Sequence, residues 1–191
     1  MKVLTVLTLA LIAATPCWSQ GVDRGPDRAW YLNLYFGHTE NRFGGEEKRV
    51  DRGFGIAYAK PEPSFRWGSN PGKLLMEFMY LHSDSRGIGT DPPNVADMYA
   101  FFASSRVQFA PRGGLGAYID PGLGILYVDR QTHDLSSKLN TVPSLGLGLY
   151  FRPRNGGEYG LGLRYLHISN SGFVAHNRGV NNLMLSLSYR F

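Results

Sequence analysis

Hydrophobic and polar residues alternate along most of this chain, in segments separated by glycine, proline and polar residues. In one of these segments, Trp30, Leu32 and Leu34 alternate with Tyr31 and Asn33. Because successive side chains of a β-strand point to opposite faces, each segment predicts a strand with one apolar face. The predicted strands cover residues 29–38, 49–60, 72–83, 96–109, 114–129, 138–152, 157–170 and 179–191.

The periodicity does not say which face of the strands is wet, so a soluble barrel or sandwich would show the same rows. The polar rows, however, carry charged and amide side chains in mid-strand, which a polar lumen accommodates and a dry core does not. These residues are Glu77, Arg106, Gln108 and Arg164. Aromatic residues also gather at strand ends, where membrane barrels have interfacial girdles. They are Trp30, Tyr58, Tyr80, Tyr127, Phe151 and Tyr189. Both features favour a membrane barrel.

The connections between the predicted strands alternate in length. Residues 110–113 and 152–157 are tight turns, whereas longer polar loops occupy 39–48, 84–95, 130–137 and 171–178. Outer-membrane barrels have short periplasmic turns and longer extracellular loops, so this alternation places the N-terminus in the periplasm. The connection 61–71 is expected to be periplasmic and is long for such a turn.

Both ends of the chain carry export features. Lys2 followed by the apolar run 3–14 predicts a secretory signal peptide with cleavage after Ser19. The run is too short for a membrane-spanning helix, which needs about 20 residues. The chain ends on Ser-Tyr-Arg-Phe, which resembles the C-terminal signal of bacterial outer-membrane proteins. We therefore predict a signal peptide (1–19) and one domain (20–191), an all-β, eight-stranded antiparallel transmembrane β-barrel of the bacterial outer membrane.

Composition narrows the chemistry. The single cysteine, Cys17, lies in the predicted signal, so the mature domain has no disulfide, thiol nucleophile or thiolate metal site. A lipoprotein with acylated Cys17 is an alternative that the preceding Pro16 disfavours. Lys and Arg number 20 against 15 Asp and Glu, which suits anionic lipid head groups. Neither a nucleotide-binding glycine pattern nor a metal-ligand spacing is present, so we expect no cofactor, no metal and no nucleic-acid partner.

The last predicted hairpin carries the candidate chemistry. His167 and Ser169 leave the same face of one strand, about 7 Å apart at a rise of about 3.3 Å per residue. Asn181 begins the next strand on the same face, at the outer lipid boundary. An imidazole beside a hydroxyl satisfies the first need of a nucleophile and its base. An ordinary polar rim leading into a loop would show the same residues, and geometry alone favours that interpretation.

A resemblance to a known family favours catalysis over an ordinary polar rim. The segment 167–172 reads His-Ile-Ser-Asn-Ser-Gly, and 177–181 reads Asn-Arg-Gly-Val-Asn. Together they resemble the signature of the lipid A 3-O-deacylase (PagL) family, small eight-stranded outer-membrane barrels that remove an ester-linked acyl chain from lipid A. The resemblance implies His167 and Ser169 as the catalytic pair and places Asn170 and Gly172 near the oxyanion site. It also implies lipopolysaccharide as the partner.

Asn181 departs from the family, in which a glutamate is the third member of the triad. A carboxylate both holds the imidazole tautomer and stabilises the imidazolium, whereas an amide does the second less well. Three outcomes stay open: a working Ser-His-Asn variant, a triad completed by a loop acid (Asp84, Glu40 or Asp134), or a barrel without activity. We favour the first.

The predicted function is hydrolysis of the 3-O-acyl chain of lipid A in the outer leaflet. Basic residues of the outer loops are candidates for binding lipid A phosphates: Arg42, Lys48, Arg49, Arg86, Arg130 and Arg178. The rival prediction is a non-catalytic barrel, adhesin-like or structural, and a pore is weaker because eight strands leave room only for side chains. The oligomeric state stays open, with a homodimer among the alternatives.

Overall fold

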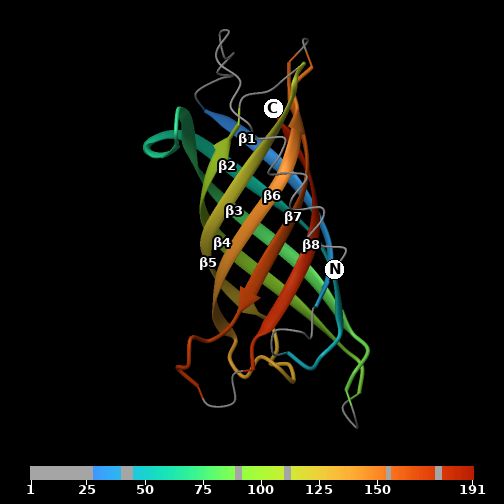
Figure 1. Ribbon diagram of the computed structural model, residues 1–191. Coiled ribbons are helices and arrows are strands. Elements are labelled where there is room, and N and C mark those ends of the chain that lie inside the picture. Colours follow the sequence, from blue (N-terminus) through green and yellow to red (C-terminus); the bar gives the residue numbers. More distant parts are fainter. Residues whose placement is uncertain (1–27, 40–44, 89–91, 110–112, 154–155, 175–177) are drawn as a thin grey trace, which may run out of the picture.

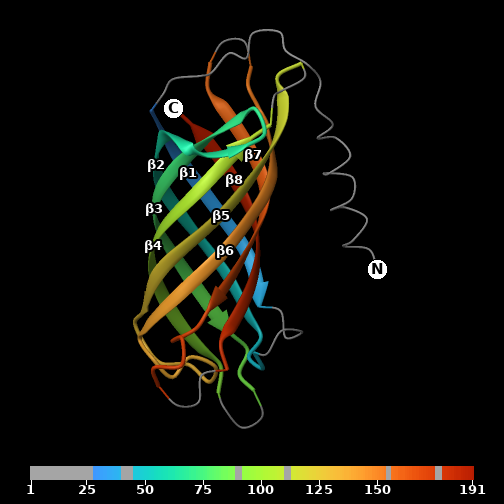
Figure 2. The ribbon, with the colours of Figure 1, turned by 60° about the vertical axis from the view of Figure 1, so that its left-hand side comes forward.

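The computed structural model describes residues 28–39, 45–88, 92–109, 113–153, 156–174 and 178–191, so the predicted signal peptide lies outside the described residues. Eight strands form one closed antiparallel barrel, in which each pairs with the next and β1 pairs with β8 (Figures 1 and 2). They are β1 (Ala29–Thr39), β2 (Arg49–Trp67), β3 (Asn70–Ser85), β4 (Asn94–Gln108), β5 (Leu115–Val128), β6 (Leu139–Phe151), β7 (Glu158–Ile168) and β8 (Val180–Arg190). The predicted fold class is confirmed. The described residues include no helix long and apolar enough to cross a bilayer.

Apolar residues form the outward rows of the strands, whereas the polar residues of the strands are mostly on the inward rows. In β1, Leu32 and Leu34 are 43% and 41% exposed, whereas the alternating Tyr31 and Asn33 are 1% and 4% exposed. The other strands repeat this apolar outer row, which includes Phe54, Phe78, Phe101, Ile125, Leu149, Leu161 and Leu187. A barrel that exposes such a belt needs hydrocarbon, not water, around its middle.

The end of the barrel at which β1 begins and β8 ends is the end predicted to be periplasmic, and ion pairs and hydrogen bonds fill the half of the lumen nearer to it. Glu77 accepts from Arg164 at 2.5 Å and from Asn33 at 2.7 Å. Arg106 binds Asp120 at 2.7 Å. The sequence suggests Arg106 or Arg164 as the partner of Glu77, and the structure selects Arg164. Nearer the extracellular end the lumen is apolar, with buried side chains that include Met79, Leu81, Met98, Phe102, Leu126, Leu166 and Met184. A packed interior agrees with a barrel of this size.

The predicted connection 61–71 is wrong, because most of it is strand. β2 continues to Trp67 and β3 begins at Asn70, with a register shift between Glu62 and Arg66. The tight turn between them contains Gly68, whose φ of 59° favours glycine. This extended hairpin projects beyond the barrel at the end that also holds the C-terminus (Figure 1). The proline residues at 61 and 63 predicted a loop, but the bulge accommodates this stretch within the strand.

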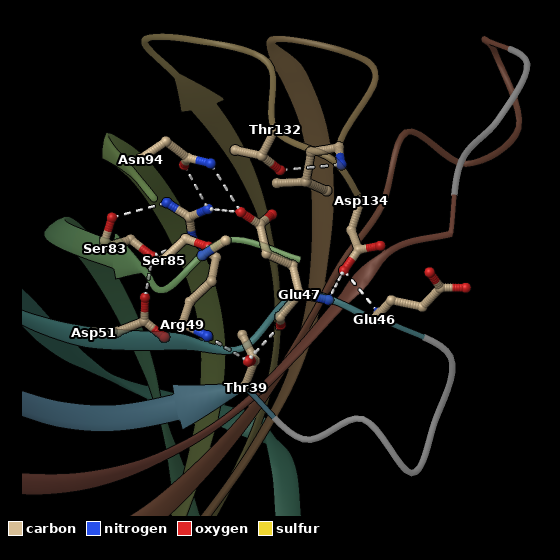
Figure 3. A network of polar contacts seen from close by, with 12 residues as sticks. Thr39, Glu46, Glu47, Arg49, Asp51, Ser83, Ser85, Asn94, Thr132 and Asp134 are labelled. Atoms are coloured by element: carbon tan, nitrogen blue, oxygen red, sulfur yellow. Dashed lines mark hydrogen bonds and ion pairs between the residues drawn. The ribbon is translucent and has the colours of Figure 1, made fainter. Parts of the chain in front are cut away.

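A polar network closes the opposite, extracellular end of the lumen (Figure 3). Arg49 is buried there and donates to Glu47 Oε1 at 2.6 Å, to Asn94 Oδ1 at 2.9 Å and to Ser83 Oγ at 2.8 Å. Asp134, in the connection between β5 and β6, accepts from the backbone N–H groups of residues 46 and 47 at 2.8 and 2.7 Å. The network therefore ties the segment before β2 to the β5–β6 connection.

Candidate active site

The β7–β8 hairpin places His167 and Asn181 directly opposite one another in register. Both belong to the outward rows of their strands, continuing Leu163 and Tyr165 on β7 and Leu183 on β8. The two-residue period predicted that the two side chains share a face, and the structure adds the register that sets them opposite one another. The structure thus brings together two of the three residues predicted as the catalytic set, at the extracellular end of the hairpin.

The contact between these two side chains has a defined chemistry. His167 Nδ1 lies 2.7 Å from Asn181 Oδ1. A carbonyl oxygen can only accept, so the imidazole carries its proton on Nδ1 when the amide is in this orientation. The lone pair is then on Nε2, the nitrogen that a general base needs free. Asn181 is therefore placed where the acid of a triad would hold the tautomer of its histidine.

Ser169 follows β7 and continues its pairing with β6. Its backbone N–H donates to Thr141 O at 3.1 Å, and the Thr141 N–H donates back to Ser169 O at 2.7 Å. Among the described residues, no hydrogen bond joins the Ser169 hydroxyl to the His167 imidazole. The two side chains share the outward face, as predicted, but they are not bonded in this conformation. Catalytic hydrogen bonds of this kind are often long without substrate and shorten in the complex.

A glycine makes room for the imidazole. Gly179 has a φ of 73°, and a Cβ there would lie 3.1 Å from His167 Cε1. Gly45 packs closely against Gly179 and Asp134. A Cβ added to Gly45 would lie 3.0 Å from Gly179 O and 3.2 Å from Asp134 Oδ2. The buried carboxylate of Asp134 thus holds a segment that packs on Gly179, and Gly179 packs on His167. The sequence gives no signal for this arrangement, because it joins three connections far apart in the chain.

Asn170 and Gly172, the predicted oxyanion residues, shape the turn after Ser169. The buried side chain of Asn170 donates to Val174 O at 3.1 Å, and its Oδ1 accepts the Gly172 N–H at 2.9 Å. The turn needs positive φ values of 54° at Ser171 and 80° at Gly172. In this conformation the Gly172 N–H is bonded to Asn170, so binding an oxyanion there requires that bond to exchange.

A model of one protein family, lipid A 3-O-deacylase (PagL), matches residues 27–190 of this chain. The chain belongs to this family. Its barrel is similar to the crystal structure of the outer-membrane enzyme PagL, with a TM-score of 0.65 and 19% identity over 83% of this chain and 97% of that one. It is also similar to Neisserial surface protein A, with a TM-score of 0.58 and 15% identity over 86% and 96% of the two chains. No curated protein matches the sequence significantly. As a member of the PagL family, the protein is an outer-membrane β-barrel.

The acids considered as substitutes for the family's glutamate lie elsewhere or outside the described residues. Asp84 binds Arg52 at 2.5 Å and lies 3.5 Å from His82. Asp134 accepts two backbone N–H groups, as described above, and Glu40 lies outside the described residues. Neither Asp84 nor Asp134 contacts His167. Among these candidates for the third position, the described side chain that is bonded to His167 is Asn181, and its role stays a prediction.

The outer basic residues differ in their availability to a lipid A phosphate. Arg49 is buried in the lumenal network and is therefore not a head-group ligand, contrary to the prediction. Arg178 binds Glu46, and this hydrogen bond lowers the pKa of the Glu46 carboxyl. Arg130 is exposed beside Asp129, at 3.6 Å. Arg42 lies outside the described residues. The described residues contain no group of three or more His, Cys, Asp or Glu arranged to hold a metal ion.

Proposed function

We propose that this member of the PagL family hydrolyses the ester-linked 3-O-acyl chain of lipid A in the outer leaflet, with Ser169 as nucleophile and His167 as general base. The observation that carries the proposal is the 2.7 Å contact between His167 Nδ1 and Asn181 Oδ1 on the outward face of the hairpin. With Nδ1 engaged in this contact, Nε2 is the ring nitrogen left to accept the proton of Ser169. Asn181 serves as the orienting residue in place of the family's glutamate.

The reaction has two steps. His167 Nε2 takes the hydroxyl proton as Ser169 Oγ bonds to the acyl carbonyl carbon, and the resulting imidazolium returns the proton to the leaving sugar oxygen. Water then attacks the acyl-serine with His167 again as base, which releases a hydroxy fatty acid and restores the serine. Backbone donors around Asn170 and Gly172 stabilise the oxyanion in each step, once Gly172 releases Asn170.

The location suits a substrate that is itself part of the membrane. The outward row below His167 on β7 includes Leu163 and Leu161, which are exposed on the outer wall of the barrel. Acyl chains of an adjacent lipid A molecule lie along this row, and the ester that joins them to the sugar lies at its polar end. The substrate therefore reaches the site by lateral diffusion and does not enter the lumen.

Mass spectrometry of lipid A from bacteria that express the chain tests the proposal. We expect wild type to remove one hydroxyacyl group and Ser169→Ala and His167→Ala to remove none, with all three barrels folded in the outer membrane. Asn181→Glu is the additional arm, because it restores the family's carboxylate. If lipid A stays intact with wild type and with Asn181→Glu, the deacylase proposal is wrong and the non-catalytic barrel replaces it.

A further inference from the structure

One side chain of the hairpin contacts the candidate site and has no role in the mechanism above. Tyr165 lies on the outward row of β7, two residues before His167, and is paired in register with Leu183. Its hydroxyl donates to Asn181 Oδ1 at 2.6 Å. His167 Nδ1 lies 2.7 Å from the same oxygen. Two donors therefore converge on one carbonyl oxygen of a side chain that is only 1% exposed.

The direction in which Asn181 faces matters because its amide has two different ends. With the carbonyl toward the imidazole, His167 is protonated on Nδ1 and its Nε2 can accept a proton from Ser169. With the amide turned over, its NH2 would donate to Nδ1 and the imidazole proton would move to Nε2. That tautomer cannot act as a base toward Ser169. A carboxylate has no such ambiguity, since both of its oxygens accept.

We propose that Tyr165 is a positioning residue that fixes the orientation of the Asn181 amide and thereby the reactive tautomer of His167; this rests on the proposed function. A phenol hydroxyl donates more strongly than it accepts, because conjugation with the ring draws electron density from its oxygen. The carbonyl end of Asn181 is therefore favoured at the point where the Tyr165 hydroxyl and the imidazole meet. Tyr165 makes an amide usable at a position where a carboxylate would need no such help.

Tyr165→Phe keeps the ring against the membrane and removes only the hydroxyl. We expect it to lower kcat about three- to tenfold, as the loss of one hydrogen bond implies, with KM unchanged. Tyr159→Phe is the matched control, because Tyr159 lies on the same outward row of β7 at the other end of the barrel. Its kinetics should equal those of wild type.

The decisive comparison repeats Tyr165→Phe in the Asn181→Glu background. There the orientation of residue 181 no longer selects a tautomer, so removing the hydroxyl should change kcat less than twofold. A packing or stability role for the hydroxyl would lower kcat equally in both backgrounds, which would overturn the proposal. The double-mutant design therefore separates positioning from general support of the hairpin.

Nitrogen-15 NMR of histidine-labelled barrel provides a readout that does not need activity. We expect the His167 ring, assigned by its loss in His167→Ala, to be protonated on Nδ1 in wild type and to shift toward the Nε2–H form in Tyr165→Phe. An unchanged tautomer in Tyr165→Phe would overturn the inference. If wild type proves inactive on lipid A, the proposed function is wrong, while these spectra still decide whether Tyr165 sets the tautomer.

Discussion

Strand β7 carries one polar cluster on each of its faces, and the two clusters are built differently. Facing inward, Arg164 forms an ion pair with Glu77 at 2.5 Å. Three residues further along and facing outward, His167 contacts the neutral amide of Asn181. The inner cluster consists of permanent charges with several partners each, whereas the outer one is a short row of neutral donors and acceptors.

The difference follows from what each side of the barrel wall requires. A buried ion is stable only if it is paired and hydrogen-bonded, and the Glu77 carboxylate accepts from Arg164, Asn33 and Tyr35. Such a group is fixed and has no spare capacity for proton transfer. At the outer wall, by contrast, His167 and Tyr165 both contact the uncharged amide of Asn181. We therefore assign stability to the inner cluster and chemistry to the outer one.

The largest effect should come from removing a charge inside. We expect Glu77→Gln to reduce the free energy of unfolding by about 3–5 kcal/mol, because it leaves the Arg164 guanidinium buried without its counter-ion. Unfolding in urea, followed by tryptophan fluorescence in detergent micelles, measures the loss. The double variant Glu77→Leu with Arg164→Leu is the control and should recover most of it. Full stability with lost activity in Glu77→Gln would contradict the division of roles.

On the outer face, removing the orienting amide should affect activity and spare the fold. Asn181→Leu keeps the branching and the number of side-chain heavy atoms but cannot accept from Nδ1, so we expect kcat to fall about a hundredfold, equivalent to about 2.7 kcal/mol. Rates of acyl release from lipopolysaccharide micelles, set beside urea unfolding of the same preparation, give both quantities. A variant that unfolds easily yet retains its rate per folded molecule would reverse our assignment.

Replacing the amide at position 181 by a carboxylate should raise the activity, in contrast to Asn181→Leu. Asn181→Glu should raise kcat about tenfold, since a negative charge stabilises the imidazolium better than an amide does. The gain should vanish as the pH falls and the new carboxyl protonates, because the charge is then lost. Comparing the pH–rate profiles of the two proteins tests this. An equal gain at all pH values would point to altered packing and not to charge.

The smallest predicted effect concerns the space beside the imidazole. Gly179→Ala should lower kcat about threefold and stability by about 1–2 kcal/mol, because alanine is strained at positive φ and its Cβ would press on the ring. Gly156→Ala is the matched control: its φ is 96°, but nothing lies within 4 Å of the added Cβ. It should share the strain and leave kcat unchanged. Equal kinetic losses in the two variants would show that contact with His167 is irrelevant.

The sequence predicts the barrel well because one local rule, the two-residue period, sets which side of the wall each residue faces. The same rule places His167 and Asn181 on one face of the hairpin, whereas the register that pairs them comes from the structure. This rule does not predict contacts that depend on side-chain conformation or on closure of the barrel. The two-residue period places Tyr165 on the outward row of β7 but does not show that its hydroxyl reaches diagonally to Asn181.

Two other features were beyond the sequence for physical reasons. The stretch 61–71 was predicted to be a connection, yet Pro61 pairs with Lys73, the register shift between Glu62 and Arg66 takes up Pro63, and the β2–β3 hairpin continues. Arg49 lies in a polar stretch of the sequence and was therefore expected at the surface. In the structure, hydrogen bonds to Glu47, Asn94 and Ser83 hold its side chain in the interior. The continued hairpin and the burial of Arg49 both depend on residues that are distant in the chain, so no local sequence pattern predicts them.

The most direct test of the account is covalent trapping at Ser169. The purified barrel in micelles is treated with a long-chain alkyl phosphonofluoridate, a reagent that bonds to activated serine hydroxyls, and the modified peptide is sequenced by mass spectrometry. We expect one adduct, on Ser169, in wild type, and none in His167→Ala. Release of the acyl chain from lipid A by a protein whose Ser169 never reacts would contradict the nucleophilic mechanism.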